Sequence, residues 1–211
     1  MKKSRSESTV VLADGNFPFH QIPLRYLKEA DHIICCDGSA QNLVEAGFIP
    51  EAIVGDLDSL GEDIASEYRD RLFIDSEQEN NDLTKAVHWC IGMGYRDIII
   101  LGATGKREDH TIGNISLLAE YVREVKVKMV TDTGIMIPCL GDSVFPSSRG
   151  QQVSIFSIDT ETEITTAGLK YPLVRRRLKN WWEATLNEAL GDSFSLEFKN
   201  GRVIVFLKYA D

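Results

Sequence analysis

The segment Ile53-Val54-Gly55-Asp56-Leu57-Asp58-Ser59 carries two acids, two residues apart, directly after a short apolar strand. In extended backbone this spacing puts both carboxylates on one face, where they repel each other unless a cation or hydrogen-bond donors compensate. Carboxylates of this kind, together with phosphate oxygens, are typical ligands of Mg²⁺ in phosphoryl-transfer sites. The segment therefore predicts a Mg²⁺ site at Asp56 and Asp58. The alternative is a polar turn in which Asp58 and Ser59 cap the next helix.

A second group of polar residues begins the helix that we expect at about 81–93. Asp82, Thr84 and Lys85 fall in its first turn, where free backbone N–H groups and the positive end of the helix dipole favour anions. Lys85 can bind a phosphate, and Asp82 can help to hold the metal or accept a proton. The alternative is an ordinary helix start, in which the pair of Asp82 and Lys85 adds only about 0.3 kcal/mol.

The loop 102–110, Gly-Ala-Thr-Gly-Lys-Arg-Glu-Asp-His, contains two glycines and leads into a helix. Such a loop can cradle phosphate, although it matches neither the P-loop nor the G-x-G-x-x-G dinucleotide motif. Arg107 offers a planar fork of donors for phosphate oxygens. Asp109 can cap the helix or bind a ligand, and His110 and Asn114 share one helix face beside the loop. The alternative for His110 is a purely structural histidine.

The first 130 residues supply strands and helices in alternation to position these groups. We expect strands at about 9–13, 32–36, 53–54, 72–74, 97–101 and 125–130. The alternation predicts an α/β fold, with a mostly parallel sheet and helices on both faces. Asp14, Asp37, Asp56, Asp75 and the loop 102–110 each follow a strand directly. We therefore expect them at the carboxyl edge of the sheet, where open α/β sheets bind ligands.

After about residue 130 the helical periodicity stops, and short alternating segments follow, punctuated by Gly and Pro. This pattern predicts a small antiparallel β domain, so we expect two domains, which comprise residues 1–130 and residues 131–211. One of its expected strands is 169–174. Trp181 and Trp182 precede small polar residues in this half, and aromatic faces suit a flat or cationic heterocycle. The alternative is that these rings pack in the core.

The chain of 211 residues has a net charge of −9. This charge argues against nucleic acid and anionic membranes as partners, so we expect a small-molecule substrate. No apolar run is long enough to span a bilayer, and no apolar segment follows the basic start, so we expect a cytoplasmic protein. The four cysteines form no metal or redox pattern, and we expect them to be buried and reduced.

Six motifs follow one another along nearly the whole chain. They are Cys36-Asp37-Gly38-Ser39-Ala40, Gly55-Asp56-Leu57-Asp58-Ser59, Asn81-Asp82-Leu83-Thr84-Lys85-Ala86, the loop 102–110 with Asn114, Gly168-Leu169-Lys170-Tyr171 and Thr185-Leu186-Asn187-Glu188. In this order and spacing they resemble the thiamine pyrophosphokinase (thiamine diphosphokinase) family. The resemblance implies an N-terminal α/β catalytic domain that binds ATP and Mg²⁺, a C-terminal β-sandwich that helps to bind thiamine, and a homodimer with active sites between the subunits.

The reaction that this resemblance implies is ATP + thiamine → AMP + thiamine diphosphate, in which the thiamine hydroxyl attacks the β-phosphorus. The implied metal ligands are Asp37, Asp56, Asp58 and Asp82. The implied catalytic residues are Asp56, Asp58, Asp82 and Arg107. One of the three acids can accept the hydroxyl proton instead of binding Mg²⁺. The implied ATP-binding residues are Gly38, Ser59, Thr84, Lys85, Gly102, Thr104, Gly105, Asp109, His110 and Asn114. The implied thiamine-binding residues are Trp181, Trp182, Thr185 and Asn187.

The chain departs from the family pattern in three places. Ser39 and Lys106 stand where a glycine is usual, and residues 184–187 replace a stretch richer in Ser and Thr. Two other functions fit the same acids. One is a pyrophosphokinase for another alcohol, such as a hydroxymethyl-pterin, which a panel of acceptors distinguishes. The other is a non-catalytic nucleotide-binding module, which would bind ATP without turnover.

Overall fold

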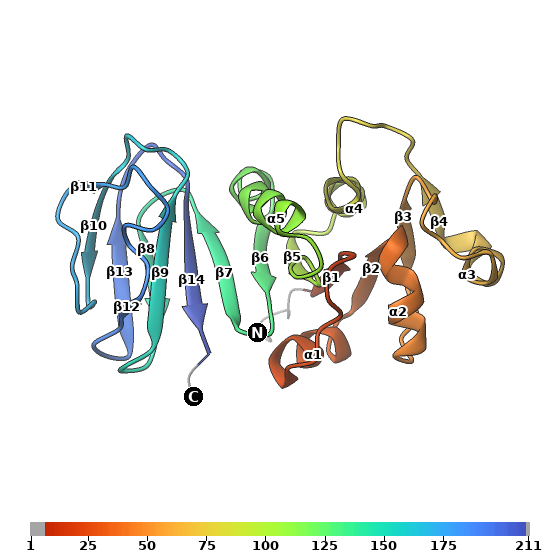
Figure 1. Cartoon of the computed structure of the whole chain (residues 1–211), viewed down its shortest axis with the longest axis horizontal. Helices are drawn as coiled ribbons and strands as arrows, with labels where there is room; N and C mark the ends of the chain where they lie inside the picture. The colour runs from red at the N-terminus through yellow and green to blue at the C-terminus, as the bar shows by residue number, and fades with distance from the viewer. Residues whose placement is uncertain (1–6, 210–211) are drawn as a thin grey trace, which may run out of the picture. The chain divides into compact units, whose positions relative to one another are not determined.

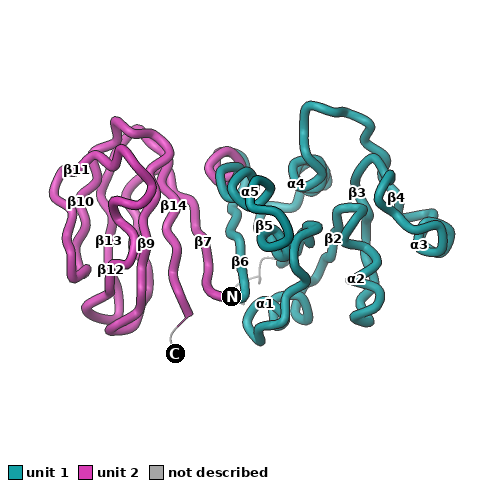
Figure 2. The backbone as a smooth tube through the Cα atoms, viewed as in Figure 1, with its two compact units in different colours: residues 1–117, 124–132 teal, residues 118–123, 133–211 magenta. Residues whose placement is uncertain are grey.

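The computed structural model describes residues 7–209, which form two compact units (Figure 2). The first unit takes in the chain up to residue 117 together with residues 124–132. The second takes in residues 118–123 and the chain from residue 133 onward. Buried apolar side chains are found in both units. The strand pairs within the first unit are parallel, and those within the second are antiparallel.

The first unit is a parallel sheet with the strand order β6-β5-β1-β2-β3-β4. Helices flank both faces of this sheet (Figure 1), which confirms the predicted α/β fold. Its strands are β1 (Thr9–Leu12), β2 (His32–Cys36), β3 (Ala52–Gly55), β4 (Leu72–Ile74), β5 (Asp97–Leu101) and β6 (Lys126–Val130). The helical segments are α1 (Gln21–Lys28), η1 (Asp37–Ser39), α2 (Ala40–Glu45), α3 (Glu62–Glu67), η2 (Arg69–Arg71), α4 (Asp82–Gly92) and α5 (Glu108–Tyr121).

The central strands of this sheet are buried on both faces. Val10 and Val11 of β1 and Ile98 and Ile100 of β5 have no exposed surface, as expected for a parallel sheet covered on both sides. Because all of these strand pairs run parallel, the carboxyl ends of the strands lie at the same edge of the sheet. The acidic turns that follow β1, β2 and β3 are therefore brought to one edge.

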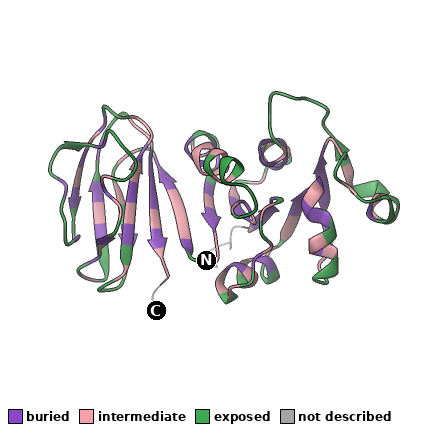
Figure 3. Ribbon diagram, viewed as in Figure 1, coloured by how far each residue is buried: buried purple, intermediate pink, exposed green. Residues whose placement is uncertain are grey.

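The second unit consists of two antiparallel sheets, with the strand orders β12-β9-β14-β7 and β11-β10-β13-β8. Buried residues alternate with more exposed ones along β9, β10 and β13 (Figure 3). This alternation buries one face of each sheet, and the predicted β-sandwich is confirmed. The strands are β7 (Gly134–Cys139), β8 (Ser143–Pro146), β9 (Gln152–Ser157), β10 (Glu163–Ala167), β11 (Arg176–Arg177), β12 (Asn187–Glu188), β13 (Ser193–Glu197) and β14 (Val203–Lys208).

The expected strand at 169–174 is wrong. Within this described segment, Leu169 makes one isolated bridge to Ala189, and no regular strand forms. Gly168 turns the chain immediately before it with a φ of +80°, and Pro172 has no N–H to donate to a neighbouring strand. The cysteines follow the expectation, because all four are free and buried. Among residues 7–209, no helix has both the length and the apolar character that a membrane crossing requires.

Strand β8 offers a direct test of the sandwich core. Phe145 is buried and its ring stacks on that of Phe194 with centroids 5.1 Å apart, whereas the adjacent Val144 is 73% exposed. We expect Phe145→Ala to lower the free energy of unfolding of this unit by about 3–5 kcal/mol, because it leaves a cavity. Val144→Ala, the control on the opposite face, should change it by less than about 0.5 kcal/mol. Urea unfolding curves of both variants measure the difference, and equal effects would contradict this core assignment.

Candidate active site

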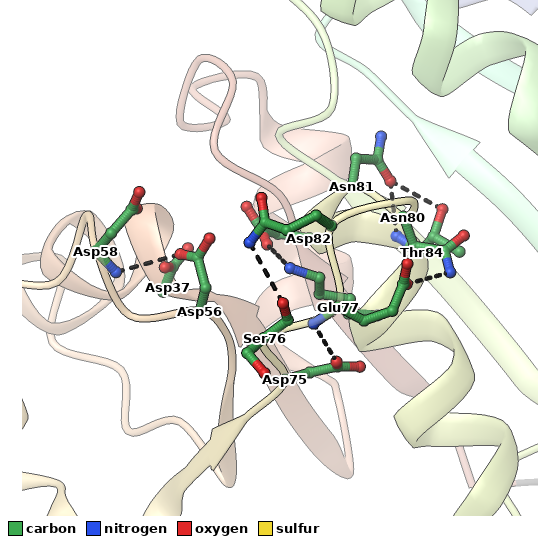
Figure 4. Close-up of polar contacts among 12 residues, drawn as sticks. Asp37, Asp56, Asp58, Asp75, Ser76, Glu77, Asn80, Asn81, Asp82 and Thr84 are labelled. Carbon is green, nitrogen blue, oxygen red and sulfur yellow. Dashed lines mark hydrogen bonds and ion pairs between the residues drawn. The ribbon is translucent and has the colours of Figure 1, made fainter.

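Three carboxylates from two different strand exits converge at the edge of the parallel sheet. Asp37 begins η1 directly after β2, and Asp56 and Asp58 follow β3. One ligand oxygen from each lies within 4.8 Å of the other two (Figure 4). These three acids, which the sequence analysis expected to share one site, thus lie close enough together that they could hold one metal ion.

The two acids after β3 converge by a different route from the extended backbone that the sequence analysis assumed. Leu57, between them, has a φ of +67°, so the chain turns sharply at this residue. The backbone N–H of Leu57 donates to Asp37 Oδ2 (3.0 Å), and that of Asp58 donates to Asp56 Oδ1 (3.2 Å). The extended geometry is thus wrong. A tight turn, held by Asp37, brings the carboxylates together instead.

Two glycines allow the backbone to pass close to these carboxylates and to the neighbouring loop. A Cβ at Gly55 would lie 2.7 Å from Cγ of Asp37, so no larger residue fits without moving that acid. Gly105, with a φ of +80°, passes so close to Asn16 that an added Cβ would lie 2.2 Å from its Nδ2. At these two positions only glycine satisfies the geometry.

The surroundings of the cluster shift the pKa values of Asp37 and Asp56 in opposite directions. Asp37 is only 3% exposed. Burial raises the pKa of Asp37, the N–H of Gly38 opposes that rise, and the charge of Asp82 adds to it. In contrast, the backbone N–H of Asp58 lowers the pKa of Asp56, with help from the charge of Lys85. A hard divalent cation such as Mg²⁺ fits this set of oxygen ligands, because it would offset repulsion that backbone N–H groups relieve only in part.

Asp82 and Lys85 form an ion pair in the first turn of α4. Lys85 Nζ donates to Asp82 Oδ1 at 3.2 Å, and the side chain of Lys85 is 3% exposed. Burial opposes the charge of Lys85, but the hydrogen bond and charge of Asp82, with the charges of Asp56 and Asp75, raise its pKa overall. Figure 4 shows Asp82 apart from the three clustered acids. Among described residues, the cluster that can hold a metal contains Asp37, Asp56 and Asp58 without Asp82.

A chain of amide hydrogen bonds connects α4 to the loop 102–110. Asn81 accepts from the backbone N–H of Thr84 (2.9 Å), which caps α4, and its amide donates to Asn114 Oδ1 (3.1 Å). Asn114 in turn donates to the carbonyl oxygen of Ala103 (3.0 Å). The loop is therefore bonded to Asn114 of α5, and Asn114 is itself bonded to Asn81 at the start of α4.

Arg107 and Asp109 are paired at the start of α5. Arg107 Nη2 and Asp109 Oδ2 lie 2.5 Å apart, and both side chains are largely exposed. The hydrogen bond from Arg107 lowers the pKa of Asp109 to about 2 and raises that of Arg107. The backbone N–H of His110 also donates to Asp109 (2.9 Å). Asp109 thus orients the guanidinium of Arg107, whose remaining N–H groups are exposed at the loop.

A cavity of about 250 Å³ opens at this edge of the sheet. Six of the predicted site residues line it, namely Ser59, Asp82, Gly105, Arg107, His110 and Asn114. Cys36 and Ser59, which also line it, are the direct neighbours of Asp37 and Asp58 in sequence. The other predicted metal and ATP residues are not among its walls: Asp37, Asp56, Asp58, Gly38, Thr84, Lys85, Gly102, Thr104 and Asp109.

The sequence-based prediction of the site left out three charged or amide-bearing residues that line this cavity, Asp14, Asn81 and Lys106. Asp14 carried a signal, since it is an acid directly after the first strand. Its carboxylate accepts from Lys106 Nζ at 2.6 Å. This contact joins residues 92 positions apart in sequence, and no local pattern indicates it.

The aromatic residues predicted to bind thiamine belong to the second unit. Trp182 is 72% exposed, whereas Trp181 packs edge-on against Phe156 with centroids 5.9 Å apart. The hydroxyl of Thr185 donates to the carbonyl oxygen of Trp182 (2.9 Å). Asn187 is buried, and its amide is bonded on both sides by the backbone of Tyr171, accepting from its N–H (3.0 Å) and donating to its carbonyl (2.7 Å).

Both halves of the chain match known protein families. The family described as "Thiamin pyrophosphokinase, catalytic domain" matches residues 24–131, and that described as "Thiamin pyrophosphokinase, substrate-binding domain" matches residues 134–206. Thiamine pyrophosphokinase of Bacillus subtilis (strain 168) is 30% identical over 161 residues, which cover 70% of this chain and 73% of that protein. Thiamin pyrophosphokinase 1 of Caenorhabditis elegans is 25% identical over 160 residues, or 69% of this chain and 65% of that protein.

Solved structures agree with these matches. The crystal structure of thiamine pyrophosphokinase from Bacillus subtilis has a TM-score of 0.82 at 24% identity, and covers 97% of this chain and 100% of that one. The crystal structure of thiamin pyrophosphokinase from Geobacillus thermodenitrificans has a TM-score of 0.78 at 26% identity, with 97% and 98% covered. The chain therefore belongs to the thiamine pyrophosphokinase family, whose members transfer the diphosphoryl group of ATP to thiamine.

Proposed function

We propose that the acidic edge of the α/β unit is where this chain carries out the reaction of its family. The chain transfers the diphosphoryl group of ATP to the hydroxyl of thiamine, which gives thiamine diphosphate and AMP. The observation that carries the proposal is the cluster of Asp37, Asp56 and Asp58, whose sequence neighbours Cys36 and Ser59 line the cavity. Acids crowded in this way beside a cavity favour a site for a metal and a polyphosphate.

In this proposal Asp37, Asp56 and Asp58 hold Mg²⁺, with Asp82 close enough for its charge to act on Asp37. A bound Mg²⁺ would neutralise negative charge on the transferred phosphates. The cluster itself supplies the negative oxygens, and the hydrogen bonds at Leu57 and Asp58 hold two of them in place. Of these acids, Asp56 is partly buried and Asp58 is exposed.

Cationic and backbone groups are proposed to bind the phosphates of ATP. Arg107 presents its guanidinium from the loop 102–110, and Lys85 supplies a buried positive charge at the start of α4. The loop contributes backbone N–H groups, and the bonds from Asn114 keep it in position. The other proposed ATP-binding residues are Gly38, Ser59, Thr84, Gly102, Thr104, Gly105, Asp109 and His110.

The proposed chemistry is an in-line displacement at the β-phosphorus. The thiamine hydroxyl oxygen forms a bond to that phosphorus, the bond from the β-phosphorus to the oxygen bridging it to the α-phosphate breaks, and AMP leaves with that oxygen. The hydroxyl proton passes to one of Asp56, Asp58 or Asp82. Catalysis of this kind depends mainly on positioning and on charge neutralisation. Arg107 assists by donating to oxygens on which negative charge is concentrated.

The second unit is proposed to bind thiamine, with residues 1–130 acting as the nucleotide domain and residues 131–211 as the thiamine domain. The exposed face of Trp182 supports a stacking role, since thiamine carries flat and cationic rings. Trp181 and Thr185 then hold the segment that presents it. Asn187, whose amide is bonded to Tyr171, contributes by shaping the neighbouring backbone.

Two wider properties are also proposed. We infer a homodimer from the family resemblance, which sedimentation equilibrium of the purified protein tests. We infer the cytoplasm as its compartment, because ATP is the co-substrate.

A pyrophosphokinase for another alcohol differs from the proposed enzyme only in the acceptor, so a panel that includes a hydroxymethyl-pterin separates the two.

The first prediction from the proposed function concerns the reaction itself. Purified protein supplied with ATP, Mg²⁺ and thiamine should form AMP and thiamine diphosphate in equal amounts, and EDTA should stop it by removing the metal. Chromatography of the nucleotides and of the thiamine esters measures both products. The assignment would be rejected by ATP binding without thiamine diphosphate, or by preferential use of another alcohol in the panel.

The second prediction concerns the acidic cluster. Asp56→Asn should lower kcat roughly a hundredfold or more, because it removes a negative ligand oxygen from the cluster. It should also raise the melting temperature without Mg²⁺, since it relieves like-charge repulsion. Added Mg²⁺ should then raise that temperature less than in the unsubstituted protein. Asp63→Asn, an exposed acid of α3 outside the cluster, is the control. An equal Mg²⁺ effect in both variants would remove Asp56 from the metal site.

The third prediction separates the two tryptophans. Trp182→Ala should raise KM for thiamine about tenfold with little change in melting temperature, because the exposed ring is free to stack on a ligand. Trp181→Ala should instead lower the melting temperature, because it removes the edge contact with Phe156. Steady-state kinetics with each substrate and thermal unfolding provide the readouts. If Trp182→Ala leaves KM for thiamine unchanged, that ring is not part of the site.

A further inference from the structure

Lys106 adopts a backbone conformation that a lysine rarely occupies. Its φ is +54°, in the left-handed region, where a side chain is strained and glycine is favoured. The position therefore accepts a lysine at a cost in backbone energy. Strain of this kind persists where the surrounding structure enforces it, and it concentrates at functional sites.

The turn after β1 and the loop 102–110 together hold Lys106 in place. The N–H of Gly15 donates to the carbonyl of Gly102 (2.6 Å), and that of Asn16 donates to the carbonyl of Thr104 (2.9 Å). The two segments are thus bonded side by side, with Asp14 and Lys106 both lining the cavity. Lys106 Nζ donates to Asp14 Oδ1 at 2.6 Å, and both side chains are about half exposed.

The ion pairs around the cavity bear on whether the ammonium group of Lys106 can bind a phosphate. Lys85 is buried against Asp82, and Arg107 is paired with Asp109. Lys106 is paired with Asp14, and because both side chains are about half exposed, this ion pair contributes little to stability. Exchange of the Asp14 carboxylate for a more highly charged phosphate is therefore favourable, and it needs only a rotation of the flexible lysine stem.

We propose that Lys106 is a further binding residue for the polyphosphate of ATP, which it takes up by exchanging Asp14 for a phosphate oxygen. The inference rests on the proposed function, because it assumes that ATP occupies this cavity. Asp14 then acts as a positioning residue. It holds the ammonium at the wall of the cavity while no nucleotide is present, and it competes with the nucleotide for that ammonium.

Four variants test this exchange. Lys106→Gly removes the charge and suits the backbone, so it should fold and melt at least as high as the unsubstituted protein, while KM for ATP rises about tenfold and KM for thiamine stays within twofold. Lys106→Arg should restore most of the ATP affinity. Asp14→Asn should lower KM for ATP, because it frees the ammonium and removes a competing negative charge. Lys126→Asn is the control. It removes an exposed lysine that pairs with Asp97 at the opposite end of the strands, and it should change neither KM.

Steady-state kinetics at two salt concentrations and equilibrium binding of a non-hydrolysable ATP analogue provide the measurements. The ATP KM of Lys106→Gly should also depend less on salt, because one charged contact is lost. If Lys106→Gly and Asp14→Asn raise KM for ATP alike, the pair only supports the loop and the inference is overturned. An unchanged KM in Lys106→Gly overturns it as well. Absence of thiamine diphosphate with the unsubstituted protein would instead reject the proposed function.

Discussion

Repulsion among three carboxylates is the constraint on which the architecture of this chain depends. Asp37, Asp56 and Asp58 hold oxygens within 4.8 Å of one another, and like charges at that distance oppose folding unless something compensates. The crowded acids at this edge of the sheet therefore lower the stability of the fold and raise its affinity for a cation.

The backbone carries much of that compensation. Peptide N–H groups at Leu57 and Asp58 donate to Asp37 and Asp56, and Gly55 makes room for the buried acid. Such donors stabilise the ionised form and fix its direction, which side chains on mobile stems do less well. This explains how a buried carboxylate is kept at a ligand position whose surroundings raise its pKa.

In the proposed function, ATP binds to the α/β unit and thiamine binds to the sandwich unit. The α/β unit concentrates loops, helix starts and charge at one edge, which suits a polyphosphate. The sandwich unit presents the exposed ring of Trp182 from a turn, which suits a flat organic cation. Lys106 belongs to the α/β unit. Its φ of +54° does not favour a lysine, so we attribute the presence of a lysine there to its side chain.

Local pattern in the sequence was enough to predict most of the framework. The strands β2, β4 and β5 begin and end at the residues expected, because continuous apolar runs between turn residues predict strands of a parallel sheet. The position of the acids after the strands followed from the same pattern, since all parallel strands finish at one edge. The likeness of six motifs to one family then indicated the reaction.

Tertiary structure alone decided the contacts that shape the site. The left-handed turn at Leu57, the bond between Asn81 and Asn114 and the pairing of Asp14 with Lys106 are absent from any local pattern. Each depends on how segments distant in sequence are brought together by strand register and helix packing. Periodicity reports which face of an element is buried. It carries no information about which polar groups from separate elements come within hydrogen-bonding distance, because that is determined only once the whole sheet has assembled.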